Sequence, residues 1–134
     1  KHMDLRKFNS VLRFCAVGSI GFIIDFSTTF MLKEHLETPP FIANSAGFCL
    51  AVSNGYFMNK YWTYQQTGKV NIHQFNKFLL SNIIGLIIYT LIIKTLLNTS
   101  HCDFFIAKIF ATITVTIWNF SAATFFIFKP AKHQ

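Results

Sequence analysis

The chain has 134 residues, of which 52% are hydrophobic and only 13% charged, and phenylalanine alone accounts for 17 of them. Charged residues make up roughly a quarter of ordinary soluble domains, so this composition indicates a membrane protein. The net charge of +7 at pH 7 does not indicate nucleic-acid binding, because no dense basic run interleaved with polar residues accompanies it.

A short basic segment precedes the first apolar stretch. Residues 1–3, KHM, resemble a cloning remnant before a natural start at Met3, and we expect residues 1–11 to form a cytoplasmic N-terminal segment. The apolar stretch that follows is too long for a signal-peptide core and lacks a small-residue cleavage pattern. We therefore expect it to remain in the mature protein as a membrane anchor.

Four apolar stretches have about the 20 residues that a helix needs to cross a hydrocarbon core of roughly 30 Å. Pro39 and Pro40 mark the start of the second, because proline is tolerated at a helix start but not inside a helix. The polar stretches QQTGKVNIHQ and NTSHCD separate the others. The pattern predicts an all-α, polytopic membrane protein with a single domain over residues 12–129, a cytoplasmic tail over residues 130–134, and transmembrane helices at about residues 12–33, 40–60, 76–97 and 104–128.

The distribution of lysine and arginine predicts the orientation of these helices. Nine of the 12 basic residues lie in the N-terminal segment, the central loop with its edges, and the C-terminal end. The other three are Lys33, Lys94 and Lys108. By the positive-inside rule, both termini and the central loop are expected in the cytoplasm.

The three cysteines show no metal-ligand spacing and form an odd set, so no disulfide framework is expected. His101, Cys102 and Asp103 invite a metal interpretation, but three consecutive side chains cannot all converge from one helix or strand. We expect a solvated turn there, and neither a metal ion nor a cofactor.

The two halves of the chain come into register when one is shifted by 64 residues. RFCAVGSIGFII then lies over KFLLSNIIGLII, and PFIAN lies over FFIAK. Chance agreement between two Phe- and Ile-rich strings is the alternative, but a match of one basic residue and one glycine at a constant offset favours duplication. We therefore expect two helical hairpins that point the same way in the membrane, a parallel repeat of the kind that builds some transporters.

Small and polar residues recur at three- and four-residue steps on the predicted helices, so that they share a face on each. Such stripes either let helices pack closely and hydrogen-bond to each other, or line a cleft. We assign packing to Gly18, Gly21, Gly47 and Gly85. The cleft interpretation is preferred for polar groups that are costly inside a membrane unless they are paired or used, namely Asp25, Asn54 and Asn119.

Four stretches, RFCAVGSIGFIIDF, NGYFMNKYWTY, KFLLSNIIG and WNFSAATFFIF, resemble the GtrA-like family of small four-helix bacterial membrane proteins. The resemblance runs from about residue 8 to residue 129. It implies a place in the bacterial cytoplasmic (inner) membrane and a role in cell-surface polysaccharide assembly, as a flippase for polyprenyl-phosphate-linked sugars or a helper of a neighbouring glycosyltransferase. One departure is that Thr124 and Phe126 stand where the first half has Lys60 and Trp62, which makes any basic site asymmetric.

A carrier of such lipids needs basic groups for the phosphate and polar groups that replace water along the crossing. The expected lipid-phosphate-binding residues lie at cytoplasmic helix ends and are Arg13, Lys60 and Lys77. Topology determination and snorkelling to lipid phosphates are the alternative for these three. The expected polar headgroup path consists of Asp25, Asn54, Asn59, Trp62, Asn82, Lys108 and Asn119.

Asp25 lies about 18 Å along its helix from Arg13, past the midplane of the membrane. We expect Lys108, which lies near the outer end of its helix, to compensate the Asp25 carboxylate. A purely structural ion pair, or an aspartate kept protonated by apolar surroundings, is the alternative.

No nucleophile with a base, phosphate-cradling glycine loop or pair of acidic metal ligands is recognisable, so an enzyme is not expected. Two other functions stay open: a proton-coupled exporter resembling the small multidrug resistance proteins, and a non-transporting scaffold for a membrane glycosyltransferase. The expected partners are the sugar lipid, such a glycosyltransferase and a second copy of the chain, since a four-helix chain makes a small bundle.

Overall fold

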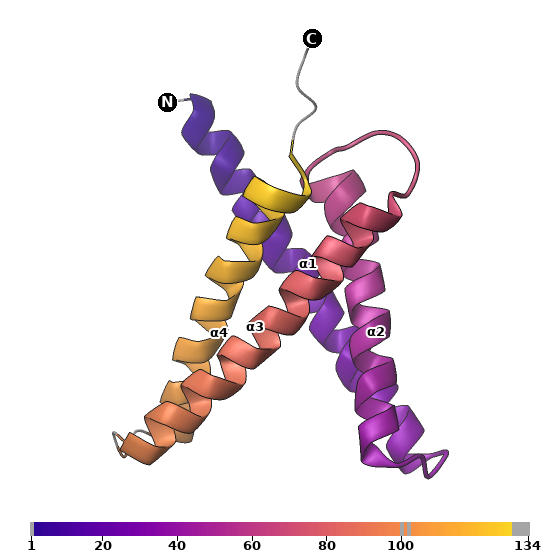
Figure 1. The fold of residues 1–134 in the computed structure, drawn as a ribbon, viewed down its shortest axis with the longest axis vertical. Coiled ribbons are helices and arrows are strands. Elements are labelled where there is room, and N and C mark those ends of the chain that lie inside the picture. Colours follow the sequence, from indigo (N-terminus) through magenta and orange to yellow (C-terminus); the bar gives the residue numbers. More distant parts are fainter. Residues whose placement is uncertain (1, 100, 102, 130–134) are drawn as a thin grey trace. The chain divides into compact units, whose positions relative to one another are not determined.

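The computed structural model describes residues 2–99, 101 and 103–129, and every regular element in this part of the chain is a helix (Figure 1). The elements are α1 (His2–Glu34), α2 (Pro40–Met58), η1 (Asn59–Thr63), α3 (Ile72–Thr99), α4 (Phe104–Ala122) and η2 (Ala123–Ile127), where η1 and η2 are single π-helical turns. The chain divides into two compact units: unit 1 extends to Lys69, and unit 2 begins at Val70.

Unit 1 is a hairpin of α1 and α2 that ends in η1. The turn between the helices places Glu37 in the left-handed region at φ 52°, and Pro40 begins α2, where its missing N–H costs nothing. The buried side chains between the two helices include Val17, Ala43 and Tyr56. Small residues at such a contact, such as Ala43 and Gly47, let the two helix backbones approach closely.

Unit 2 is a hairpin of α3 and α4 that ends in η2. Trp118 of α4 donates its indole N–H to the carbonyl of Ser81 on α3 at 3.0 Å. One helical turn earlier on α3, the rings of Phe78 and Phe128 meet edge to face with centroids 5.9 Å apart. Hydrogen bonding and aromatic packing therefore hold this hairpin together.

The two units share their construction at equivalent positions. α4 and η2 begin and end 64 residues after α2 and η1. Each π-helical turn closes with a backbone hydrogen bond of 2.8 Å, from Tyr64 N to Asn59 O in unit 1 and from Phe128 N to Ala123 O in unit 2. The offset found in the sequence is therefore also the offset between the second helices of the two units.

Three helical stretches of the described chain are long and apolar enough to cross a membrane: Leu5–Glu34, Ile72–Thr99 and Ile106–Ile127. This confirms a membrane protein with apolar helices. The expected second crossing, α2, has 19 residues and would measure about 28 Å, but Asn44, Ser45, Ser53 and Asn54 lower its apolar character. Length and composition alone therefore support three of the four expected crossings.

Two helices begin earlier in the chain than the membrane crossings expected within them. α1 begins at His2 and not near residue 12, because Leu5, Phe8 and Leu12 continue its apolar face towards the N-terminus. α3 begins at Ile72 and not near residue 76, because Asn71 caps it. The Asn71 Oδ1 accepts hydrogen bonds from the backbone N–H groups of His73 at 2.9 Å and Gln74 at 3.4 Å.

The Trp118→Phe variant is expected to lower the stability of unit 2 by about 0.5–1.5 kcal/mol, since it removes the hydrogen bond that links α4 to α3. Thermal unfolding of the purified protein in detergent measures this effect. Thr114→Val is the matched control, because the Thr114 hydroxyl bonds to the carbonyl of Phe110 within α4 itself. Equal unfolding temperatures for Trp118→Phe and the wild type would contradict the assigned role of the indole.

Candidate functional site: a basic and aromatic cluster at the end of unit 1

Lys60 is the buried cation of unit 1. It lies in η1 and is only 4% exposed, although lysine is seldom buried unless it has partners. Its Nζ lies 6.0 Å from the ring centre of Tyr56, one helical turn earlier, and 5.9 Å from that of Tyr61. It also lies 3.5 Å from the Oε1 of Gln66. Aromatic faces and an amide oxygen therefore hold the ammonium in place.

Arg13 ties α1 to the same π-helical turn. Its Nη1 donates to the backbone carbonyl of Trp62 at 2.9 Å, and its guanidinium carbon lies 5.5 Å from the centre of the Trp62 ring. An arginine has five N–H donors in a rigid fork, so one bond to a carbonyl leaves further donors for an anion. We call Arg13, Tyr56, Lys60, Tyr61 and Trp62 the basic–aromatic cluster.

Asn59 and Thr63 stabilise the turn that carries this cluster. The Thr63 hydroxyl donates to the Oδ1 of Asn59 at 2.8 Å, and both residues are buried. The loop that follows folds back over η1, since the backbone N–H of Gln66 donates to the carbonyl of Lys60 at 2.8 Å. Asn59 therefore has a structural hydrogen bond, and its place on the headgroup path stays a prediction.

The remaining predicted residues of unit 1 lie along the hairpin. Asp25 is half-buried on α1, and its Oδ1 lies 3.3 Å from the Oγ1 of Thr29. Asn54, half-buried on α2, points its amide towards the sulfur of Met58 at 3.3 Å, and sulfur is a weak acceptor. An asparagine amide with so weak a partner inside α2 has unused hydrogen-bonding capacity.

In unit 2, Lys77 is exposed near the start of α3, and Asn82 donates its amide to the carbonyl of Phe78 at 2.9 Å. The Oδ1 of Asn119 is buried and receives no hydrogen bond within the described part of the chain. An ideal Cβ on Gly85 would lie 3.0 Å from that oxygen, so a glycine is what lets α3 approach Asn119.

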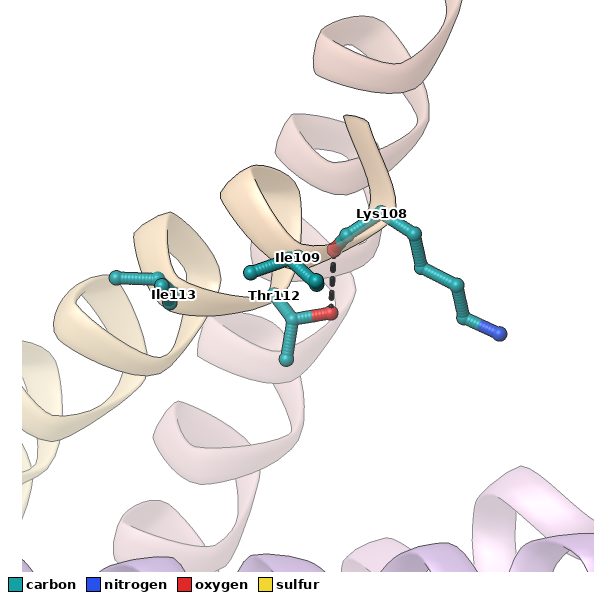
Figure 2. A pocket seen from close by; sticks show the side chains of 4 residues that line it. All are labelled: Lys108, Ile109, Thr112 and Ile113. Atoms are coloured by element: carbon teal, nitrogen blue, oxygen red, sulfur yellow. Dashed lines mark hydrogen bonds between the residues drawn. The ribbon is translucent and has the colours of Figure 1, made fainter. Parts of the chain in front are cut away.

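Lys108 lies on an apolar patch of α4 (Figure 2). A shallow hollow of about 290 Å³ is lined there by Lys108, Ile109, Thr112 and Ile113, and the lysine side chain extends away from the other three. The Thr112 hydroxyl donates to the carbonyl of Lys108 at 2.7 Å, within the helix itself. Since Asp25 belongs to unit 1 and Lys108 to unit 2, the expected pairing of the two stays a prediction.

Four of the predicted site residues meet at η1: Arg13, Asn59, Lys60 and Trp62. Tyr56, Tyr61 and Gln66, which contact Lys60, were not predicted as site residues, and neither was Thr29, which lies beside Asp25. The sequence could have indicated Tyr56 and Thr29, because each lies four residues from a predicted site residue and so on the same helix face. No helical spacing indicates Gln66, because it lies in the loop after η1.

The described residues contain no cluster of possible metal ligands, that is, no three side chains of histidine, cysteine, aspartate or glutamate lie together. Cys102, part of the expected solvated turn, lies outside those residues, and so does the tail over residues 130–134. Cys15 and Cys49 are free thiols.

The fold and the cluster define a small all-helical membrane protein with cations held at a helix end. The family model for the GtrA/DPMS transmembrane domain matches residues 13–128, and the chain belongs to this family, as the resemblance predicted. The chain is also similar to the "Uncharacterized membrane protein YngA" of Bacillus subtilis (strain 168), with 28% identity over 123 residues that cover 91% of this chain and 81% of that protein.

Proposed function

We propose that the protein is a flippase, or an accessory carrier, for polyprenyl-phosphate-linked sugars in cell-surface polysaccharide biosynthesis. Its place would be the bacterial cytoplasmic membrane, with both termini in the cytoplasm. Membership of the family supports this proposal. The observation that supports it most is the burial of Lys60, 4% exposed, between two tyrosine rings at the helix end where the basic residues concentrate.

The basic–aromatic cluster suits an anionic, hydroxyl-rich headgroup. A lysine has three donors and an arginine five, and hydrogen bonds from such cations to a phosphate are about twice as strong as neutral ones. Trp62 is 43% exposed, so its ring is accessible beside Arg13 as a platform for the apolar face of a sugar. The isoprenoid tail needs no site, since hydrocarbon is its solvent.

The carrier would be built from two duplicated hairpins and four crossings. The offset of 64 residues between α2 with η1 and α4 with η2 supports the duplication. It also supports a crossing by α2, because the equivalent stretch Ile106–Ile127 is apolar enough to span. Thr124 and Phe126 at the positions of Lys60 and Trp62 leave unit 2 without an equivalent cation, so the headgroup would engage unit 1 first.

Asn54 and Asn119 would replace water along the path of the headgroup. Their replacement by leucine, which has nearly the same shape, is expected to preserve expression and oligomeric state while abolishing sugar-lipid movement. Size-exclusion chromatography in detergent and a flipping assay measure the two properties separately. Misfolding of both variants would instead support a packing role for these side chains.

The function is tested by reconstituting the protein in proteoliposomes with a fluorescent polyprenyl-phosphate sugar and measuring how fast a membrane-impermeant quencher reaches it. Acceleration over protein-free vesicles is expected. A proton-coupled exporter would ignore the lipid and respond to pH and cationic drugs. A scaffold would do neither, but would raise the activity of a co-reconstituted glycosyltransferase. Neither an enzymatic activity nor a cofactor is proposed, and a homodimer is the simplest assembly.

A further inference from the structure

Asp25 has no charged side chain near it along its own hairpin. No other aspartate, glutamate, lysine, arginine or histidine occurs from Phe14 to Leu32, and none occurs in α2. Lys60 of η1 follows Asn44, the α2 residue beside Asp25, by 16 residues, or about 24 Å along the helix. The titratable side chains of α2, Cys49 and Tyr56, do not line the hollow at Asp25.

Oxygen atoms surround the carboxylate of Asp25. The Oγ1 of Thr29 lies 3.3 Å from the Oδ1 of Asp25 and 3.4 Å from the backbone carbonyl of Ala43. A hydroxyl has one proton, so it can donate to only one of these two oxygens at a time. Three oxygens with one proton among them make an electron-rich site that a positive charge would satisfy.

The distances between these oxygens are long for hydroxyl hydrogen bonds and are compatible with a shared cation. Hydroxyl hydrogen bonds usually measure about 2.7–2.8 Å between oxygens. Two oxygens that bind one cation at about 2.4 Å, at right angles to each other, lie roughly 3.4 Å apart. The two separations observed here, 3.3 and 3.4 Å, are of that size.

A hollow at this place leaves room for an ion with water. It measures about 180 Å³ and is lined by Phe22, Asp25, Phe26, Thr29 and Asn44. One water occupies about 30 Å³ in the liquid, so the hollow holds several. Asn44, which also lines the hollow, carries an amide oxygen of the type that hard cations bind, and the two phenylalanines form an apolar wall.

Gly47 allows α2 to approach this site. An ideal Cβ there would lie 2.6 Å from the Oγ1 of Thr29 and 2.7 Å from the backbone oxygen of Asp25. Any side chain at position 47 would therefore occupy the space between the carboxylate and α2. The glycine keeps the Ala43 carbonyl within reach of Thr29.

We propose that unit 1 binds one Na⁺ ion at Asp25 with Thr29, the Ala43 carbonyl and Asn44. A single carboxylate matches a single positive charge, whereas a divalent ion would leave a net charge among apolar residues. Inside a membrane span this neutralises the aspartate without a basic side chain from unit 1. If the function proposed above holds, cation binding here couples headgroup movement to an ion gradient.

Thermal unfolding of the purified full chain in detergent tests the site without any sugar lipid, so the result does not depend on the proposed function. NaCl is compared with choline chloride at constant ionic strength, across pH 5–8. A rise of the unfolding temperature with NaCl alone, lost in Asp25→Asn, indicates Na⁺. A dependence on pH but not on Na⁺ would overturn the proposal.

Glu34→Gln is the matched control, because Glu34 is an exposed acid at the end of the same helix, and it should keep the wild-type response. If Asp25→Asn does not fold, Thr29→Val is the second test variant of the site. Loss of even outer partners of a metal site weakens binding 10- to 100-fold, so the apparent Na⁺ affinity should fall at least about tenfold, as measured with ²²Na⁺. Responses to Na⁺ and pH that are the same in wild type and Asp25→Asn, or equally lost in Glu34→Gln, would overturn the proposal.

Discussion

The Gly47→Ala variant is expected to unfold at a markedly lower temperature than the wild type. The added Cβ would contact both the side chain and the backbone oxygen of Asp25, the latter at 2.7 Å. A flexible side chain can rotate away from a new methyl group, but a helix backbone can only move as a whole. Overpacking of this kind costs about 1–3 kcal/mol and sometimes more, and the contact with backbone places Gly47→Ala at the upper end.

Gly18→Ala, on α1 of the same unit, is the matched control. No heavy atom lies within 4 Å of the Cβ that this substitution adds. Alanine is favoured over glycine inside a helix by about 1 kcal/mol, so the unfolding temperature should stay equal or rise slightly. Circular dichroism of the detergent-solubilised variants measures both changes. A similar loss of stability in the two variants would mean that the contact of α1 with α2 at Gly47 is not the cause.

The contrast between Gly18 and Gly47 shows what the sequence pattern can predict. A stripe of small residues predicted close packing for four glycines, and Gly21, Gly47 and Gly85 do lie at contacts between helices. Gly18 does not contact a neighbouring helix within its hairpin. Periodicity identifies the residues that share a helix face, but the register between two helices decides which of them touch the partner.

Helix positions were predictable wherever the sequence interrupts an apolar run. Proline placed the start of α2 at residue 40, and the polar turn placed the start of α4 at residue 104. α3 begins four residues before the expected crossing because Asn71, whose side chain caps the helix, stands within a mostly polar stretch that gives no clear helix start. The π-helical turns η1 and η2 were not predicted, because an i to i−5 hydrogen bond has no signature in composition.

Part of the candidate site was predictable, because basic and aromatic residues mark the cytoplasmic ends of the expected crossings. Arg13, Lys60 and Trp62 were selected because each belongs to a helix end near the expected cytoplasmic surface, and they do meet at η1. Their mutual contacts were not foreseen, because Arg13 and Trp62 are 49 residues apart in the chain. Local spacing finds neighbours within one helix, such as Tyr56 and Lys60, and says nothing of contacts across a hairpin.

Lys60→Met is expected to weaken binding of a polyprenyl phosphate about 10- to 150-fold, more than any other lysine substitution in unit 1. Methionine keeps most of the apolar stem between Tyr56 and Tyr61 but removes the ammonium. Hydrogen bonds to charged groups contribute about 1.5–3 kcal/mol, which corresponds to that loss of affinity. Fluorescence quenching of a labelled polyprenyl phosphate in nanodiscs measures the dissociation constant. Lys60→Ala should lose affinity to the same extent, with an additional loss of stability, because it leaves a cavity.

Lys69→Ala is the matched control, because Lys69 carries the same charge but is exposed in the loop that follows η1. Its effect should stay below about twofold and vanish at high salt, as screening predicts for a solvated charge. The loss in Lys60→Met should persist at high salt, because the ammonium of Lys60 is buried against the tyrosine rings and is screened less. Equal losses in both variants, removed together by salt, would reduce the role of Lys60 to general attraction of an anionic lipid. A loss confined to Lys60 would support a specific phosphate site at η1, where the ammonium lies against the rings of Tyr56 and Tyr61.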